Sequence, residues 1–226
     1  GYLMCAILGG SYRCLTADDI QSINRLFEHS QIRGKHATGI SYCDGDSIRT
    51  IKYPIPGKEF INSIDLTAFI GKEFAFIGHC RYSTSDLEYN QPIADDDLAI
   101  VHNGVITQEP FETWQGEFTT KNDSEFVFKS HKTGSNPILD FPDASLAVCG
   151  LTKNDIFFYR NGKRPLHYCL INDNLIISST YDIIVRSGIC TSGEISKAVP
   201  GFTYSFDRCK LDLKELQEMK EYIDAI

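Results

Sequence analysis

Cys5 is the side chain of this sequence best placed for nucleophilic chemistry, because it lies so close to the start of the chain. It follows Met4 in the run Met-Cys-Ala-Ile-Leu-Gly over residues 4–9. Removing the residues up to Met4 would put a thiol and a free α-amino group on one residue. An α-amine, with a pKa of about 8, can act as the base for its own side chain. The competing interpretation is a core cysteine in a first strand, where a buried thiol behaves as a small hydrophobe.

Two further groups of polar side chains follow apolar segments, at points where strands are expected to end. One is the run Gly-His-Cys-Arg-Tyr-Ser-Thr over residues 78–84, and the other is His102-Asn103-Gly104. The guanidinium of Arg81 has the planar fork that grips a carboxylate through two hydrogen bonds. The side chain of Asn103 and the backbone N–H of Gly104 can form an oxyanion hole. The alternatives are a surface ion pair for Arg81 and a tight turn at Asn103-Gly104.

Five segments have the pattern of helices. Helical spacing of apolar residues predicts helices over 17–29, 58–69, 123–131, 181–187 and 212–225. Thr16 is expected to cap the first helix, and the run Asn-Asp-Ser-Glu over 122–125 is typical of a helix N-terminus with Asp123 as its cap. The last helix would carry Leu213, Leu216, Met219 and Ile223 on one face. That stripe favours packing within the chain over docking of a partner.

Strands outnumber these helices. They are expected over 4–9, 38–43, 47–53, 73–79, 97–102, 144–151, 155–160, 166–171, 174–179 and 202–206. Many are joined by turns of hairpin length, such as Asp44-Gly45-Asp46 and Asn161-Gly162, so the sheets should be mainly antiparallel. The sequence therefore predicts an α+β layered fold. Because no repeat, linker or low-complexity tract divides the chain, a single domain over 1–226 is expected.

Composition excludes several classes of protein. The 226 residues are 42% hydrophobic and 23% charged, with a formal net charge of -8 that argues against broad binding to nucleic acid. No apolar run approaches the roughly 20 residues that span a bilayer, and the start of the chain lacks the features of a signal peptide. The eight cysteines contain no C-x-x-C pair, which fits neither a zinc ribbon nor a disulfide scaffold. A cytoplasmic protein without a membrane association is expected.

The order of the motifs along the chain is more specific than any one of them. In sequence they are Met-Cys-Ala-Ile-Leu-Gly (4–9), Arg33-Gly34-x-x-x-Thr38-Gly39, Gly78-His79-x-Arg81-Tyr82-x-Thr84, Gln91-Pro92, His102-Asn103-Gly104 and Asp123-Ser124-Glu125. This set resembles the class II glutamine amidotransferase domain, the N-terminal-nucleophile (Ntn) glutaminase of glucosamine-6-phosphate synthase, amidophosphoribosyltransferase and asparagine synthetase. The likeness continues through Arg164-Pro165-Leu166 and Val199-Pro200-Gly201, so it covers nearly the whole chain.

The resemblance implies a fold and an assignment for each matching residue. The fold would be a four-layer αββα sandwich with two mainly antiparallel sheets. Cys5 would attack the side-chain amide of L-glutamine and form a thioester, while Asn103 and Gly104 hold the oxyanion. The remaining site residues would bind substrate: Arg81 the α-carboxylate, Asp123 the α-ammonium, and Tyr82, Thr84 and His102 the rest of the glutamine pocket. Neither a metal nor an organic cofactor is implied.

The sequence departs from the family pattern in two places. Residue 6 is Ala where the family usually has Gly, and Gly1 to Met4 precede the nucleophile. We therefore expect residues 1–4 to be a leader or an expression remnant that is removed before Cys5. The resemblance also implies a partner, a synthase subunit or domain that accepts the ammonia. Two alternatives stay open: an Ntn amidase acting on another amide or a γ-glutamyl compound, and an inactive module that binds glutamine.

Overall fold

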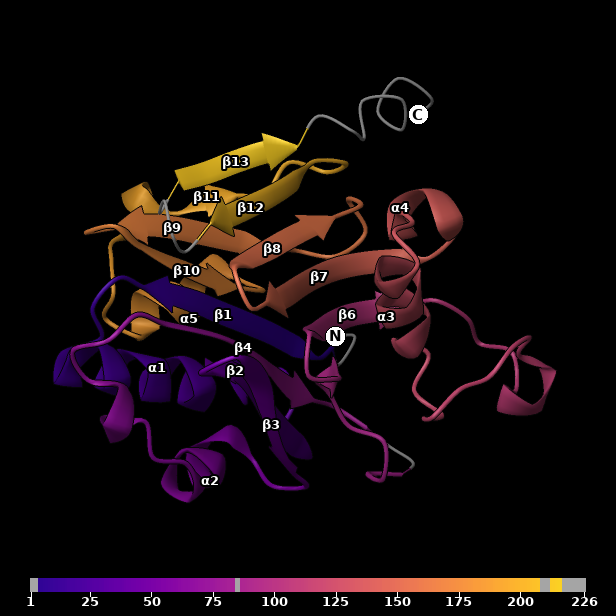
Figure 1. Ribbon diagram of the computed structural model, residues 1–226, viewed down its shortest axis with the longest axis horizontal. Coiled ribbons are helices and arrows are strands. Elements are labelled where there is room, and N and C mark those ends of the chain that lie inside the picture. The colour runs from indigo at the N-terminus through magenta and orange to yellow at the C-terminus, as the bar shows by residue number, and fades with distance from the viewer. Residues whose placement is uncertain (1–3, 84–85, 208–211, 217–226) are drawn as a thin grey trace.

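The strands of this protein form two sheets, shown in the computed structural model of Figure 1. The structure describes residues 4–83, 86–207 and, for the backbone alone, 212–216. The first sheet has the order β11-β9-β10-β1-β4-β2-β3 and the second β13-β12-β8-β7-β6-β5. Every pair of neighbouring strands in these ranges is antiparallel. The predicted antiparallel α+β fold is confirmed.

The strand bounds agree closely with most of the expected segments. The first sheet contains β1 (Ala6–Tyr12), β2 (Ala37–Asp44), β3 (Ser47–Tyr53), β4 (Phe74–Arg81), β9 (His167–Ile171), β10 (Asn174–Ser178) and β11 (Ser196–Lys197). The second contains β5 (Ile93–Ala94), β6 (Leu98–Val105), β7 (Ser145–Thr152), β8 (Asp155–Arg160), β12 (Thr203–Asp207) and β13 (Asp212–Leu216). The two-residue strands β5 and β11 are too short to give a periodic signal and were not expected.

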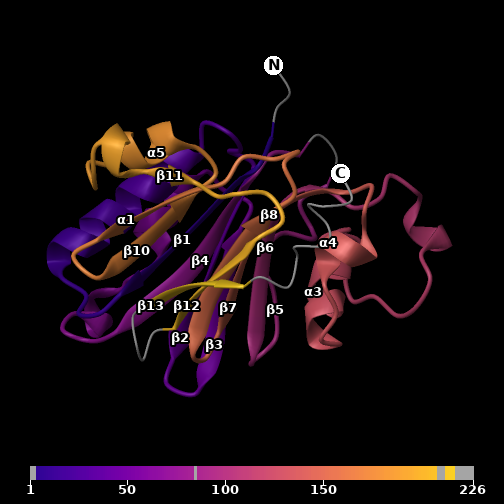
Figure 2. The same ribbon diagram turned by 90° about the horizontal axis from the view of Figure 1, so that it is seen from above.

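Helices cover the outer faces of both sheets, which gives four layers. The helices are α1 (Ala17–Ser30), α2 (Gly57–Phe60), α3 (Glu125–Lys132), α4 (Pro137–Asp140) and α5 (Tyr181–Arg186). One apolar cluster joins α1, α2 and α5 to the first sheet, and another joins α3 and α4 to the second. A third cluster fills the space between the sheets. Figure 2 shows this order of layers from one side of the molecule to the other, the αββα arrangement.

The start of α1 shows how local sequence sets an element. The Thr16 hydroxyl accepts a hydrogen bond of 3.1 Å from the Asp19 backbone N–H, and the Asp19 carboxylate accepts one of 2.9 Å from the Thr16 N–H. This reciprocal capping box satisfies two backbone donors that the first turn of a helix leaves free. The helix then buries Leu26 and Phe27 against the first sheet. The helix predicted over 17–29 is confirmed.

The helix predicted over 58–69 is wrong. The segment contains α2 and then two short 3₁₀ turns, Ile61–Ser63 and Thr67–Phe69. Polar side chains bond to the backbone and interrupt the helix: the Ser63 hydroxyl donates to the Phe60 carbonyl at 2.6 Å, and the Asp65 carboxylate accepts from the Thr67 N–H at 2.9 Å. Such local bonds offer the backbone an alternative to helical hydrogen bonds.

The helix predicted over 212–225 is also wrong in the part that the structure describes. Residues Asp212–Leu216 form β13, which pairs with β12 in the register Phe206↔Leu213. The run Leu-Asp-Leu-Lys over 211–214 alternates apolar and polar residues, as an edge strand does, and pairing with β12 decides between the two periods. Residues 217–226 lie outside the described ranges, so the rest of that prediction stays untested.

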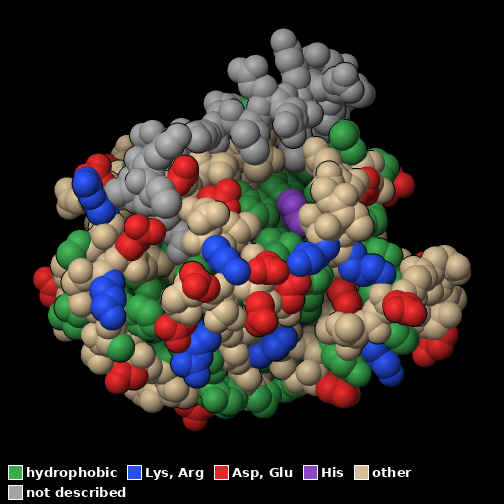
Figure 3. Space-filling view, in the orientation of Figure 1, with side chains coloured by type: hydrophobic (Ala, Val, Ile, Leu, Met, Phe, Trp, Pro, Cys, Tyr) green, Lys and Arg blue, Asp and Glu red, His purple; other side chains and the backbone are tan. Residues whose placement is uncertain are grey.

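Lys, Arg, Asp and Glu side chains are interspersed over the face seen in Figure 3, without a large area of one sign. Within the described ranges, no helix has the length and apolarity needed to cross a membrane. The seven cysteines of these ranges are free thiols.

Candidate active site

Strand alternation brings the predicted nucleophile and the predicted oxyanion residue to the same layer. Ile7 and Val101 both belong to the cluster that fills the space between the sheets. Successive side chains of a strand point to opposite faces. Cys5, two residues before Ile7, and Asn103, two residues after Val101, therefore face this layer near one end of the sandwich. Arg81 lies four residues after Ile77, which also belongs to this layer, so by the same rule the Arg81 side chain faces the layer.

A cleft of about 330 Å³ opens at this end of the two sheets. Its wall includes five of the residues predicted from the sequence: Cys5, Arg81, His102, Gly104 and Asp123. They come from the ends of β1, β4 and β6 and from the turn that precedes α3. The other lining residues are His79, Gln91, Val105, Thr107, Trp114, Lys121, Asn122 and Ser124.

The Cys5 thiol is held by backbone rather than by side chains. Its Sγ lies 3.4 Å from the Tyr82 backbone N–H, which donates to it, and 3.8 Å from the Tyr82 carbonyl. Arg33 fixes the residue from the other side by donating from Nε to the Cys5 carbonyl at 3.1 Å. Burial raises the pKa of the thiol, although the Tyr82 backbone and the charges of Arg81 and Arg33 oppose this shift. Among the described residues, no side chain hydrogen-bonds to Sγ, so the thiol has no side-chain base there.

Asn103 and Gly104 have the properties that an oxyanion hole requires. The Asn103 side chain is only 2% exposed, yet its Nδ2 finds no hydrogen-bond partner. A buried donor without a partner is rare, because it loses its bond to water and gains none in exchange. Gly104 has φ 148°, and a Cβ at this position would lie 1.9 Å from the Ser145 carbonyl oxygen. Only glycine fits there, and it keeps the backbone beside the cleft free of a side chain.

His102 joins the end of β6 to the turn before α3. Its Nε2 lies 2.9 Å from the Ser145 carbonyl, which only accepts, so we assign the proton to Nε2. The Nδ1 atom then accepts from the Ser124 hydroxyl at 2.8 Å. Gln91 completes the network, since its amide bonds both to the His102 backbone and to Ser124. Burial lowers the pKa of His102, which keeps the ring neutral. Both ring nitrogens are thus occupied in holding the cleft wall.

Arg81 and Asp123, the two predicted partners of an amino acid's charged groups, lie in the cleft wall but also hold its loops. Arg81 donates from Nη1 to the Tyr89 carbonyl at 3.1 Å and to Asn90 Oδ1 at 2.7 Å. The Asp123 carboxylate accepts from the Ile106 N–H at 2.7 Å. The expected role of Asp123 as the cap of α3 is wrong. The N-cap of α3 is Ser124, whose side chain makes no capping hydrogen bond. The Asp123 carboxylate instead turns back to the segment after β6.

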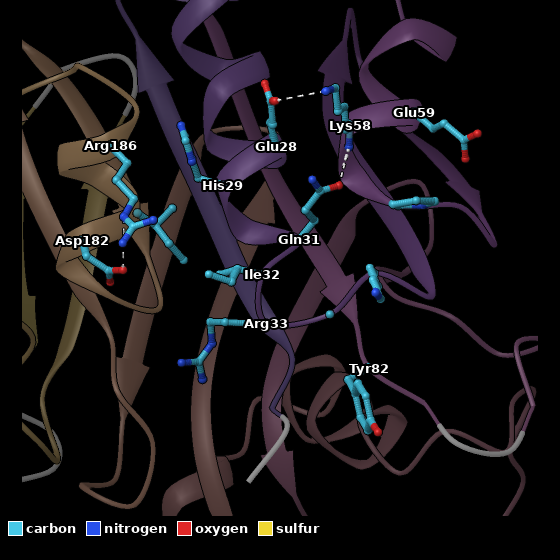
Figure 4. A pocket seen from close by; sticks show the side chains of 14 residues that line it. Glu28, His29, Gln31, Ile32, Arg33, Lys58, Glu59, Tyr82, Asp182 and Arg186 are labelled. Atoms are coloured by element: carbon cyan, nitrogen blue, oxygen red, sulfur yellow. Dashed lines mark hydrogen bonds and ion pairs between the residues drawn. The ribbon is translucent and has the colours of Figure 1, made fainter. Parts of the chain in front are cut away.

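Of the described site residues, Asn103 and Tyr82 are not among those that line the cleft. The Tyr82 ring packs on the His36 ring, with centroids 5.0 Å apart, and points into a separate groove (Figure 4). Only its backbone reaches Cys5. Thr84 lies outside the described residues, so its assignment stays a prediction.

The groove beside Tyr82 is the larger cavity, at about 810 Å³. Two exposed ion pairs border it, Lys58 with Glu28 and Arg186 with Asp182, each with a separation of 3.9 Å (Figure 4). Apart from Tyr82 it contains none of the predicted site residues. The smaller cleft is therefore the candidate active site, because the nucleophile and the charged groups meet there.

Two glycines outside the cleft allow its walls to meet, and the sequence analysis gave them no role. A Cβ on Gly34 would lie 2.5 Å from the backbone carbon of Arg81, and one on Gly39 would lie 2.1 Å from the Gln91 carbonyl oxygen. Contacts this short exclude any side chain, so both positions require glycine for the close approach of backbone. Both glycines belong to the motif Arg33-Gly34-x-x-x-Thr38-Gly39, and this motif was the signal from which their close backbone contacts could have been predicted.

His79, Trp114 and Lys121 also lie in the cleft wall and were not predicted from the sequence as site residues. Burial, helped by the charge of Arg81, lowers the pKa of His79 to about 3, and its Nε2 has no partner. In the described ranges, no three His, Cys, Asp or Glu side chains come together as metal ligands.

Comparisons with known proteins identify the fold. No family model and no curated protein matches this sequence. Among solved structures, the chain is similar to the glutamine phosphoribosylpyrophosphate amidotransferase of B. subtilis, with a TM-score of 0.68 and 21% identity. It is also similar to a structure described as the allosteric regulatory enzyme of purine biosynthesis, with a TM-score of 0.70 and 20% identity. Each match covers 93% of this chain but 48% of the solved one, so the chain spans about half the length of these two proteins.

A third similar structure is a glutamine aminotransferase class-II domain protein from Silicibacter pomeroyi, with a TM-score of 0.54 and 10% identity. That match covers 93% of this chain and 98% of the solved one. At these identities the likeness concerns architecture. The two antiparallel sheets, the helical outer layers and the solved structures that share them agree: this chain has the fold of the class II glutamine amidotransferase domain, an Ntn-hydrolase sandwich.

Proposed function

We propose that this protein hydrolyses L-glutamine to glutamate and ammonia through a thioester on Cys5. The observation that carries the proposal is the buried Nδ2 of Asn103, a donor without a partner on the layer that Cys5 also faces. An unsatisfied donor of this kind suits an acceptor that arrives only with the substrate. The oxygen of a tetrahedral intermediate, which becomes negative as the reaction proceeds, is such an acceptor.

The proposed reaction begins with the Cys5 thiol, whose proton passes to the α-amine of the same residue once Cys5 is N-terminal. Sulfur then bonds to the side-chain carbonyl carbon of glutamine, and the carbonyl oxygen takes the negative charge. Asn103 Nδ2 and the Gly104 N–H donate to that oxygen. Collapse of the intermediate breaks the C–N bond, and the proton held by the amine leaves with ammonia. Water then attacks the thioester, which gives glutamate and restores the thiol.

In the part of the chain that the structure describes, no side chain hydrogen-bonds to Sγ, which supports the use of the α-amine. Burial raises the pKa of the Cys5 thiol, so a base close to sulfur is needed to form the thiolate. The buried His79 and His102 are poor bases, because their pKa values are lowered and both ring nitrogens of His102 are engaged. The α-amine of an N-terminal Cys5 would lie within its own residue.

We further propose that Arg81 and Asp123 bind the α-carboxylate and the α-ammonium of the substrate, and that the ammonia goes to an acceptor on a partner subunit or domain. The two longer solved proteins extend well beyond the matched fold, and one is called an amidotransferase. A cytoplasmic location stays part of this proposal.

The proposal is tested on protein that begins at Cys5. Incubation with L-glutamine should release ammonia and glutamate in equal amounts, and acid quenching should trap a glutamyl adduct on Cys5 that mass spectrometry detects. Cys5→Ala should abolish both the adduct and the ammonia while the fold, followed by circular dichroism, is retained. Ammonia release by Cys5→Ala at the normal rate would refute the thioester mechanism.

A further inference from the structure

The segment between β6 and α3 forms one wall of the cleft, although it has almost no regular structure. It runs from residue 106 to 124 and contains a single 3₁₀ turn, Phe111–Thr113. Loops this long that lack secondary structure are uncommon in compact folds and are usually functional. Here the loop contributes Trp114, Lys121 and Asp123 to the cleft.

The loop is fixed by an aromatic cluster around Trp114. The indole lies 5.1 Å from the Phe111 ring, 5.1 Å from the Phe118 ring and 5.0 Å from the Phe126 ring, all edge-on. Its Nε1 donates to the Glu109 carbonyl at 3.0 Å. These contacts hold the indole in one orientation with its remaining surface at the cleft. The wall is thus built before a ligand arrives.

The end of the loop is anchored at several points. The Glu125 carboxylate accepts hydrogen bonds from the backbone and the hydroxyl groups of Thr119 and Thr120, at 2.8 to 2.9 Å. The Asn122 side chain donates to the Tyr89 carbonyl at 3.1 Å, the same oxygen that Arg81 contacts. Residue 121, between these anchors, is held beside the cleft together with Arg81.

Lys121 lies between these anchors with its charge unpaired. Its Nζ is 5.6 Å from the centre of the Phe111 ring, next to Trp114, and no carboxylate of the described residues forms an ion pair with it. Two residues later Asp123 brings a negative charge to the same cleft. A lysine and an aspartate that line the same cleft match the carboxylate and the ammonium of a free α-amino acid.

We propose that Lys121 and Trp114 determine substrate specificity, Lys121 by binding the α-carboxylate together with Arg81, and Trp114 by packing on the methylene groups of the side chain. The inference rests on the proposed function and adds its selectivity: the substrate must carry a free α-carboxylate and an apolar link to the amide. Arg81 donates to Tyr89 and Asn90 through Nη1 alone, so its other N–H groups are available to bind the carboxylate beside Lys121.

The first test compares two substrates in Lys121→Met. With L-glutamine, KM should rise about fivefold at unchanged kcat, the effect of an ion pair at a solvent-exposed side chain. With the α-methyl ester of L-glutamine, which lacks the carboxylate, the same substitution should leave KM unchanged. Lys121→Arg should restore the wild-type KM for glutamine. The control is Lys153→Met, which removes the same charge at the far end of β7, where Lys153 pairs with Asp97.

The second test uses the indole itself, since Trp114 is the single tryptophan of the chain. In Cys5→Ala, which binds without turnover, L-glutamine should shift the emission of Trp114 to shorter wavelength as water leaves the ring. Trp114→Ala should raise KM about tenfold by removing the apolar contact. Trp114→Phe keeps a ring in the aromatic cluster, so its KM should stay within about twofold of the wild-type value. This variant shows whether the loop itself is intact.

The outcomes separate this inference from the proposed function. Glutamine that binds by calorimetry without any change in Trp114 emission, together with an unchanged KM in Lys121→Met, would overturn the inference and leave the glutaminase proposal standing. A fivefold rise in KM with both substrates would also overturn it, because the lysine would then act without regard to the carboxylate. Failure of glutamine to bind to the folded protein would instead contradict the proposed function.

Discussion

Two consecutive residues at the end of β4, its last residue Arg81 and the following Tyr82, line different cavities. Arg81 faces the smaller cleft with Cys5, whereas the ring of Tyr82 faces the larger groove. The groove is bordered by exposed ion pairs and by Arg33, whose buried Nη2 has no partner, while the cleft is lined by His79, whose buried Nε2 has none. The cleft differs from the groove in bringing the thiol of Cys5 together with Arg81 and Asp123, so the kinds of side chain that meet, rather than volume, mark where chemistry is prepared.

Among the predicted variants, Asn103→Ala should cause the largest loss of catalytic rate. We expect kcat to fall roughly 100- to 1,000-fold with KM little changed, because the contact strengthens as the oxyanion forms. Since Nδ2 has no partner in the free protein, stability to denaturant should change little. Steady-state kinetics and urea unfolding measure the two effects. A normal kcat would show that Asn103 only shapes the strand end.

Arg81→Ala and Tyr82→Ala compare the two cavities directly. Arg81→Ala should raise KM for glutamine roughly 10- to 100-fold, the range for a hydrogen bond to a charged group. Tyr82→Ala should leave KM nearly unchanged, because its ring lies in the groove and only its backbone contacts Cys5. Equal rises in both variants would mean that the ring enters the cleft when glutamine binds.

The buried His79 predicts how stability changes with pH. Its pKa is about 3 in the folded protein, below the value of roughly 6.5 expected for an unfolded histidine. The unfolded state therefore takes up the proton first, so stability is full above pH 6.5 and is lost as pH falls towards 3. Between pH 7.5 and 5 this histidine alone should lower the free energy of unfolding by about 2 kcal/mol.

His79→Gln is the matched variant for that measurement. Its free energy of unfolding, from urea titrations at each pH, should vary less between pH 7.5 and 5 by about the same 2 kcal/mol. Parallel curves for the two proteins would show that His79 is protonated in the folded state as readily as in the unfolded one.

Lys58→Met should have the smallest effect and serves as the groove-side control. The ion pair of Lys58 with Glu28 is exposed and 3.9 Å long, so its loss should change stability by less than about 0.5 kcal/mol. Glutamine KM and kcat should not change. A clear loss of activity would show that the groove takes part in the reaction, against the distinction drawn between the two cavities.

The parts of the site predicted from the sequence are those that follow strand periodicity. Cys5, Arg81 and Asn103 lie at strand ends, and alternation from neighbouring apolar residues suffices to direct them to one layer. The network of Gln91, His102 and Ser124 was not predicted, because it joins residues 11 and 33 positions apart through side-chain geometry that no local pattern encodes.

The two incorrect helices have a similar cause. Over 58–69 the apolar spacing was helical, but hydrogen bonds from Ser63 and Asp65 to nearby backbone outweighed it. At Asp212–Leu216 the leucines fit either period, and pairing with β12, a contact distant from any local signal, decided for a strand. Strand pairing and hydrogen bonds from side chains to the backbone thus determined the secondary structure where the local spacing of apolar residues was ambiguous.

The central claim is that Cys5 acts with its own α-amine as base. The direct measurement is the rate of ammonia release from glutamine by protein that begins at Cys5 and by protein that begins at Gly1, each confirmed by intact mass. We expect release by the first and almost none by the second, since a peptide bond converts the α-amine into an amide that cannot act as a base. Equal rates from the two proteins would contradict it.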